Sequence, residues 1–128
     1  MRIDLHTHSN ASDGTQSPAV VVACAVQAGL DALALTDHDT TAGWDEATAA
    51  AARAGIDLVR GIEVSCEHEG VSIHLLGYLH DPQAPGLLAE LDRSRASRQS
   101  RAQRIVELLS RDVPLRWEDV LAQIAPEG

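Results

Sequence analysis

Two histidines near the start of this 128-residue chain have the type and spacing expected of metal ligands. His6 and His8 are separated by one residue in a short alternating run, and side chains two positions apart lie on the same face of a strand. Asp4 shares that face and adds a carboxylate to the two imidazoles. An H-x-H pair alone is a weak signal, because imidazole is a common metal donor but also a common structural group. The hypothesis therefore depends on the rest of the chain.

Further ionisable residues lie at or near the ends of four apolar segments. Asp13 occupies a turn-like stretch directly after the first run, and His38 follows a second apolar segment over 33–36. Glu63 lies in a third apolar segment and His74 in a fourth. An unpaired charge among apolar neighbours is costly, so four such placements favour one shared site over coincidence.

The segments that would position these residues alternate between strands and helices. Ser17 and Pro18 predict the start of a helix over 19–28, and Gly29 predicts its end. The pattern then predicts a strand over 30–36, an Ala-rich helix over 41–54 and a strand over 56–65. This order is typical of an α/β fold with parallel strands and right-handed crossovers, in which residues at the carboxyl ends of the strands meet at one rim.

The short connection between Glu63 and His74 leaves no room for a crossover helix, so it predicts an antiparallel hairpin. A four-residue loop over 67–70 would place Glu63 opposite His74, with their Cβ atoms about 5 Å apart. A two-residue loop over 69–70 would instead place His74 opposite Ser65. We favour the four-residue loop.

Together these motifs resemble the PHP (polymerase and histidinol phosphatase) superfamily of metal-dependent phosphoesterases. They follow the family's order and are His6-Thr7-His8, Ser12-Asp13-Gly14, Thr36-Asp37-His38-Asp39, Gly61-Ile62-Glu63-Val64 and His74. The chain is most similar to the branch that removes phosphate from nucleoside 3′,5′-bisphosphates and trims short RNA. The resemblance implies the N-terminal part of a distorted (β/α)7 PHP barrel over 1–83, with a helical extension over 84–128. It covers only the first part of the family's usual length.

The resemblance also implies a set of metal ligands. It predicts three metal positions, held by His6 and His8 with Glu63, by Glu63 with His74, and by Asp13 with His38. We expect two or three divalent ions, and a mixed imidazole and carboxylate set suits Mn²⁺ best, with Zn²⁺, Fe or Mg²⁺ as alternatives. Hydroxide generated at the metals would attack phosphorus, so no catalytic side chain is predicted.

Five other residues in or near these motifs have roles that we expect from their positions. We expect Asp4, Asp37 and Asp39 to orient the ligand imidazoles. His68 and His80 match no motif of the family, and we expect both to lie on the surface.

A long helix is predicted over 86–111, and it contains a candidate substrate-binding arginine. Arg98 is seven residues from both Leu91 and Ile105, which places it on the apolar stripe of that helix. A guanidinium on a buried face needs an anionic partner. Arg98 is therefore a candidate phosphate clamp; the alternatives are a salt bridge to an acidic side chain and a helix that bends before Arg98.

Charge and apolar content restrict the classes of partner. Residues 1–92 carry fourteen acidic residues and three arginines, whereas residues 93–128 carry seven arginines and five acidic residues. Bound divalent cations would offset much of the acidity, so phosphate can still bind. No apolar run approaches the length of a membrane span. Cys24 and Cys66 lack C-x-x-C spacing, which favours free thiols in a cytoplasmic protein.

These observations predict a metal-dependent phosphoesterase that acts on a phosphorylated small molecule or a short oligonucleotide. One alternative is a phosphatase of the histidinol-phosphate type. Another is a non-catalytic PHP-like metal-binding module, because the family's later His and Asp ligands have no counterpart in this chain. An incomplete barrel exposes a sheet edge, which predicts self-association. The resemblance leaves open whether 128 residues alone turn over a phosphate ester.

Overall fold

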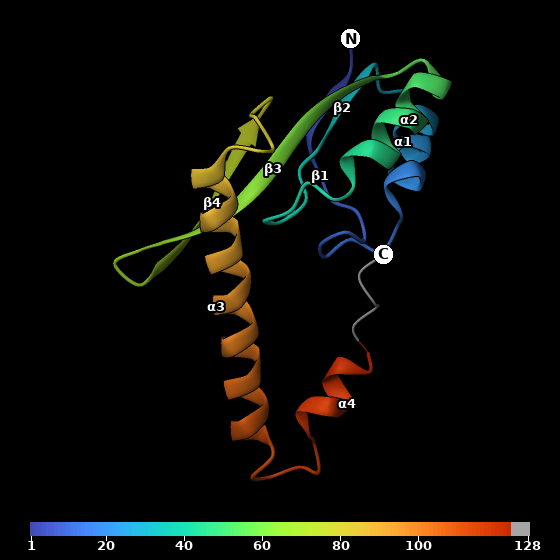
Figure 1. Cartoon of the computed structure of the whole chain (residues 1–128). Coiled ribbons are helices and arrows are strands. Elements are labelled where there is room, and N and C mark those ends of the chain that lie inside the picture. The colour runs from blue at the N-terminus through green and yellow to red at the C-terminus, as the bar shows by residue number, and fades with distance from the viewer. Residues whose placement is uncertain (124–128) are drawn as a thin grey trace. The chain divides into compact units, whose positions relative to one another are not determined.

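The computed structural model describes residues 1–123 and contains one mixed sheet with four helices in the described part (Figure 1). The strands are hydrogen-bonded in the order of the chain, β1-β2-β3-β4. They are β1 (Ile3–Thr7), β2 (Ala32–Leu35), β3 (Asp57–His68) and β4 (Val71–Tyr78). The helices are α1 (Pro18–Gln27), α2 (Trp44–Ala54), α3 (Pro85–Leu109) and α4 (Trp117–Leu121). The predicted α/β class is confirmed, and β1, β2 and β3 are parallel as expected.

The chain divides into two compact units, Met1–Leu91 and the residues from Asp92 onward. The boundary between these units lies inside α3. The sequence predicts a division after residue 83, just before that helix, and this division stays a prediction; residues 124–128 lie outside the described part of the chain.

The ends of α1 and α2 follow from their capping residues. The Ser17 hydroxyl accepts a hydrogen bond from the backbone N–H of Val20, and Pro18 occupies the first turn, where its missing N–H has no cost. Gly55 ends α2 with a φ of 70°, in the left-handed region that favours glycine. Trp44, rather than Thr41, is the first residue of α2.

The core of the first unit lies between these two helices and the central strands (Figure 1). Leu33 and Leu35 of β2 are almost fully buried, together with Val22 from α1 and Trp44 from α2. Small alanines on α2 let the two helices approach each other closely; they are Ala47, Ala50 and Ala51. This packing fixes β2, and with it the segment that leads to His38.

The hairpin of β3 and β4 has a different register from the predicted one. His74 is paired with Ser65, and Glu63 is paired with Leu76, so the four-residue loop is wrong. The turn consists of residues 69–70, whose φ angles of 50° and 76° are both in the left-handed region. Such turns match the twist of a hairpin, which favours the two-residue connection. His74 nevertheless lies on the same face as Glu63, because Ser65 and Glu63 are two positions apart.

The helical part of the second unit does not follow the predicted apolar stripe. Val106 is buried, whereas Arg98 and Ile105 are exposed. Leu91 is buried as expected, but it belongs to the first unit. Among residues 1–123, no helix is both long enough and apolar enough to cross a membrane.

Candidate metal centre

The end of β1 directs two imidazoles toward the same carboxylate. The ring centroids of His6 and His8 are 5.0 Å apart. The Nε2 atoms of His6 and His8 lie 2.7 Å and 3.0 Å from Oε2 of Glu63. The register of β1 with β2 is irregular between Asp4 and Thr7, at the position of His6. The predicted shared direction of the two histidines is thus present, although His8 lies just beyond the strand.

Backbone pairing with β3 positions His38 next to the same carboxylate. Beyond β2, the chain continues beside β3, with an isolated parallel bridge between His38 and Glu63. The Glu63 N–H donates to the carbonyl of Asp37 (3.2 Å), and the Asp39 N–H donates to the carbonyl of Glu63 (3.0 Å). This pairing places His38 Nε2 at 3.6 Å from Oε2 of Glu63.

His74 approaches the carboxylate from the hairpin. Its Nδ1 atom lies 2.5 Å from Oε1 of Glu63, the oxygen that the other three imidazoles do not contact. The two residues are diagonal neighbours in the ladder, and a long side chain reaches such a neighbour. The predicted contact is therefore formed in spite of the changed register.

Glu63 is the centre of this arrangement. Its side chain is 4% exposed, and four imidazoles surround it. Burial raises the pKa of the Glu63 carboxyl, but the hydrogen bonds from His6 and His74 and the charges of His38 and His6 together hold that pKa below its ordinary value. The carboxylate is thus kept ionised in a buried position, as a metal ligand requires.

Asp13 is brought to the site by a compact loop that Asp37 organises. The buried Asp37 carboxylate accepts hydrogen bonds from the backbone N–H and the hydroxyl of Ser9 (both 2.7 Å) and from the hydroxyl of Ser12 (2.8 Å). The Gly14 N–H donates to the Ser9 carbonyl, and a Cβ at Gly14 would lie 2.7 Å from the carbonyl oxygen of His8. Only glycine lets the loop fold back this closely.

The loop leaves the Asp13 carboxylate between two imidazoles. Its oxygens lie 3.4 Å from Nδ1 of His8 and 3.6 Å from Nε2 of His38. The side chain of Asp13 is 66% exposed, whereas that of His38 is 12% exposed. Asp13 therefore closes the site on its solvent side.

The six predicted ligands form three overlapping groups whose donor atoms lie within 4.8 Å of one another. The groups are His6, His8 and Glu63; His8, Asp13 and His38; and His38, Glu63 and His74. The residues fit divalent cations, because Nδ1 of His8, which faces the Asp13 carboxylate, is buried without a hydrogen-bond partner. Imidazole and carboxylate donors without thiolate are the set that Mn²⁺ and Zn²⁺ accept.

The aspartates predicted to orient imidazoles accept hydrogen bonds from backbone groups and hydroxyls, and their role toward the imidazoles stays a prediction. Asp4 accepts from the backbone N–H of His6 (3.1 Å), and Asp37 supports the loop of Asp13. Asp39 accepts from the backbone N–H of Ser65 (2.8 Å), which ties β3 to the segment of His38. At least Asp4 and Asp37 thus position backbone around the ligands.

Sequence reasoning missed the role of Ser9 and the partial burial of His80. Ser9 is fully buried beside Asp37, and only its place directly after the H-x-H motif could have drawn attention to it. His80 is less exposed than predicted: its ring packs on Trp44 at 5.0 Å, and both ring nitrogens are enclosed without a hydrogen-bond partner. Burial lowers the pKa of His80, and the charge of Asp81 raises it in part.

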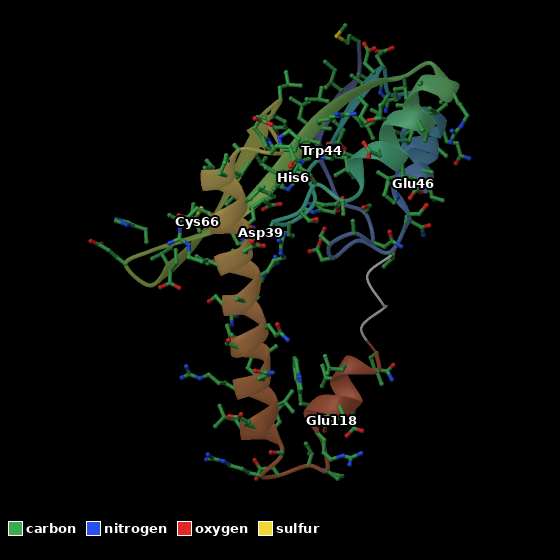
Figure 2. All side chains as sticks on the ribbon, viewed as in Figure 1. His6, Asp39, Trp44, Glu46, Cys66 and Glu118 are labelled. Carbon is green, nitrogen blue, oxygen red and sulfur yellow. The ribbon has the colours of Figure 1, made fainter. Side chains whose placement is uncertain are left out.

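Three other residues singled out in the sequence, Arg98 and the two cysteines, belong to none of the ligand groups. Arg98 belongs to α3 in the second unit, so its role as a phosphate clamp stays a prediction. Cys66 lies along the hairpin, as Figure 2 shows, and it is exposed with a free thiol, like Cys24.

The profile of the PHP domain matches residues 4–118 of this chain. The chain belongs to the PHP domain family. Among curated proteins, this PHP chain is 44% identical over 110 residues to a 5′-3′ exoribonuclease of Haemophilus influenzae, covering 86% of the chain and 40% of that protein. It is 41% identical over 124 residues to a 3′,5′-nucleoside bisphosphate phosphatase of Chromobacterium violaceum, covering 91% of the chain and 44% of that protein.

Solved structures give the same result for the fold. A protein of Bifidobacterium adolescentis, provisionally described as a metal-dependent phosphoesterase, matches with a TM-score of 0.90 and 43% identity over 98% of the chain and 44% of that structure. An amidohydrolase of Chromobacterium violaceum with bound sulfate and no metal matches with a TM-score of 0.81 and 41% identity, over 88% of the chain and 40% of that structure. The PHP chain spans less than half the length of these relatives.

Proposed function

We propose that the protein is a metal-dependent phosphoesterase that acts on nucleotide or short-oligonucleotide phosphates. The observation that carries the proposal is the buried Glu63, whose two oxygens join four imidazoles into overlapping ligand groups on a PHP fold. The relatives named as a bisphosphate phosphatase and an exoribonuclease support this class of substrate. The sulfate in the Chromobacterium violaceum structure supports an anionic ligand.

The six ligand residues are proposed to hold two or three divalent cations, with Mn²⁺ favoured by the mixed nitrogen and oxygen donors. Such cations, when bound, activate water near neutral pH and neutralise phosphate charge. The Glu63 carboxylate would hold the two groups that share it at a fixed separation, and the loop of Asp13 would close the third group.

The exposure of the ligands indicates where a phosphate would enter. The side chains of His6, His74 and Asp13 are 49%, 50% and 66% exposed, whereas Glu63 and His38 lie deeper. The site thus has a buried floor of Glu63 and His38 and an open rim. This rim is where we propose that the phosphate of a nucleotide or of an oligonucleotide end enters.

Three further proposals concern a substrate contact, the cellular location and self-association. Arg98 is proposed to bind a substrate phosphate, because an arginine is suited to bidentate phosphate contact. A cytoplasmic location is supported by the two free thiols. Self-association through the sheet edge is supported by β1, an edge strand on which Ile3 and Leu5 are about half exposed.

A non-catalytic metal-binding module is the second candidate. It is favoured by one observation, namely that the ligand groups can hold a cation without any other residue of the chain. Further ligands or substrate contacts from a longer polypeptide would then be needed for turnover. A phosphatase of the histidinol-phosphate type is separated from the first proposal by its substrate.

The test is hydrolysis of a nucleoside 3′,5′-bisphosphate by the Mn²⁺-loaded chain, with histidinol phosphate as the competing substrate. Release of phosphate from the bisphosphate, abolished in the Glu63→Gln variant, would support the proposal. Preference for histidinol phosphate would replace the substrate class. Stoichiometric Mn²⁺ binding without turnover of either ester would favour the non-catalytic module.

A further inference from the structure

The side chain of Tyr78 connects the two edges of the sheet. Its hydroxyl donates a hydrogen bond of 2.8 Å to the backbone carbonyl of Leu5. Tyr78 is the last residue of β4 and Leu5 lies in β1, and these strands are at opposite ends of the strand order, with β2 and β3 between them. The contact is therefore a direct link across the sheet between strands that share no ladder.

Gly61 provides the space for this link. Tyr78 is paired with Gly61 in the ladder of β3 and β4. A Cβ at Gly61 would lie 2.7 Å from Cγ2 of Thr36, closer than real Cβ atoms come, and 3.0 Å from Cδ1 of Tyr78, which is a tight contact. The tyrosine ring thus lies over a glycine, and the missing side chain of Gly61 leaves room for the ring to cross β3 toward β1.

Both ends of the link lie beside metal-ligand candidates. Leu5 directly precedes His6, inside the stretch of β1 where the register with β2 is irregular. Tyr78 is four residues after His74 and on the same face of β4. His6 contacts Oε2 of Glu63 and His74 contacts Oε1. The link therefore joins the two strands whose histidines contact the two oxygens of this carboxylate.

We propose that Tyr78 is a positioning residue of the metal centre, which holds the strand of His6 at a fixed separation from the strand of His74. The inference rests on the proposed function, because it assigns Tyr78 a role in the metal site. In a sheet with an irregular edge strand, the separation of these two histidines would otherwise depend on the ladders through β2 and β3 and on the contacts of both rings with Glu63. The hydroxyl is the group that matters, because the ring alone cannot bind the Leu5 carbonyl.

The first test is Mn²⁺ binding by the Tyr78→Phe variant of the whole chain, measured by competition with a fluorescent chelator. Losing one neutral hydrogen bond at this position is expected to weaken binding about fivefold. The matched control is Ser72→Ala, which removes a hydroxyl from the same face of the same strand, at an exposed residue. Unchanged Mn²⁺ affinity in Tyr78→Phe, or an equal loss in Ser72→Ala, would overturn the proposal.

The second test needs no metal and separates this inference from the proposed function. Two-dimensional NMR of the metal-free chain resolves the histidine rings, and Tyr78→Phe is expected to shift the ring signals of His6 and His74. The signals of His68, exposed at the end of β3, serve as the internal reference and should stay in place. Unshifted His6 and His74 signals would refute a positioning role. A lower melting temperature with unshifted signals would show a purely structural one, which also refutes it.

Discussion

The Glu63→Gln substitution is expected to disable two of the three ligand groups and leave the third. Glu63 belongs to the group with His6 and His8 and to the group with His38 and His74, whereas the group of Asp13 does not include it. Glutamine keeps the size of the side chain and removes its charge. The protein should therefore stay folded while its capacity for tightly bound Mn²⁺ falls.

The size of the effect follows from the distances in the site. The donor atoms of each group lie within 4.8 Å of one another, so a cation held among them is no further than this from the Glu63 carboxylate. At an effective dielectric constant of about 20, two unit charges 4.8 Å apart interact by about 3.5 kcal/mol. Removing the carboxylate charge should then weaken binding at both groups at least about 300-fold.

Isothermal titration with Mn²⁺ on the metal-free chain gives the stoichiometry and the affinities directly. The matched control is Glu67→Gln, the same change at an exposed position of the same strand, and its titration should overlay that of the wild type. Asp13→Asn should show the opposite pattern, with weaker Mn²⁺ binding only at the group of His8, Asp13 and His38. Wild-type affinity at all positions in Glu63→Gln would refute the shared-carboxylate reasoning.

Three other substitutions test the surroundings of the site. Gly61→Ala is expected to destabilise the fold by about 1–3 kcal/mol through overpacking, measured by urea unfolding. Asp37→Asn should cost at least about 2 kcal/mol, because the buried network with Ser9 and Ser12 loses its charge and one of its two acceptor oxygens, and thermal unfolding should show it. The folded state disfavours the charged form of His80, so stability should fall as the pH drops below the unfolded pKa of about 6.5 and level off below the lowered folded pKa. In His80→Phe, the loss of the urea midpoint between pH 7.5 and pH 5.5 should be smaller; an equal loss would show that other groups cause it.

The convergence of the ligands could be predicted from the sequence because it depends on local rules. Alternation along a strand places His6 and His8 on one side, and parallel strands bring the end of β2 next to β3. The bridge between His38 and Glu63 is the direct result of that second rule. These features need no knowledge of side-chain packing.

The parts that were not predicted depend on interactions between distant residues. The four-residue loop over 67–70 would pair Glu63 with His74 directly. The left-handed conformations at 69–70 set a different register, and the two side chains still meet because each reaches its diagonal neighbour. The stripe through Arg98 assumed one buried face along α3. That helix belongs to two compact units, so Leu91 and Val106 are buried in different surroundings and need not share a stripe.

The position of Glu63 also determines how the centre would fill with metal. Its two oxygens serve two groups with a single negative charge, so the first cation to arrive neutralises much of the attraction that would draw the second. Filling of the two groups is therefore expected to be anticooperative, with half-loaded molecules over a wide range of metal concentration. Preparations of one and the same polypeptide would then differ in metal content according to the metal supply during growth.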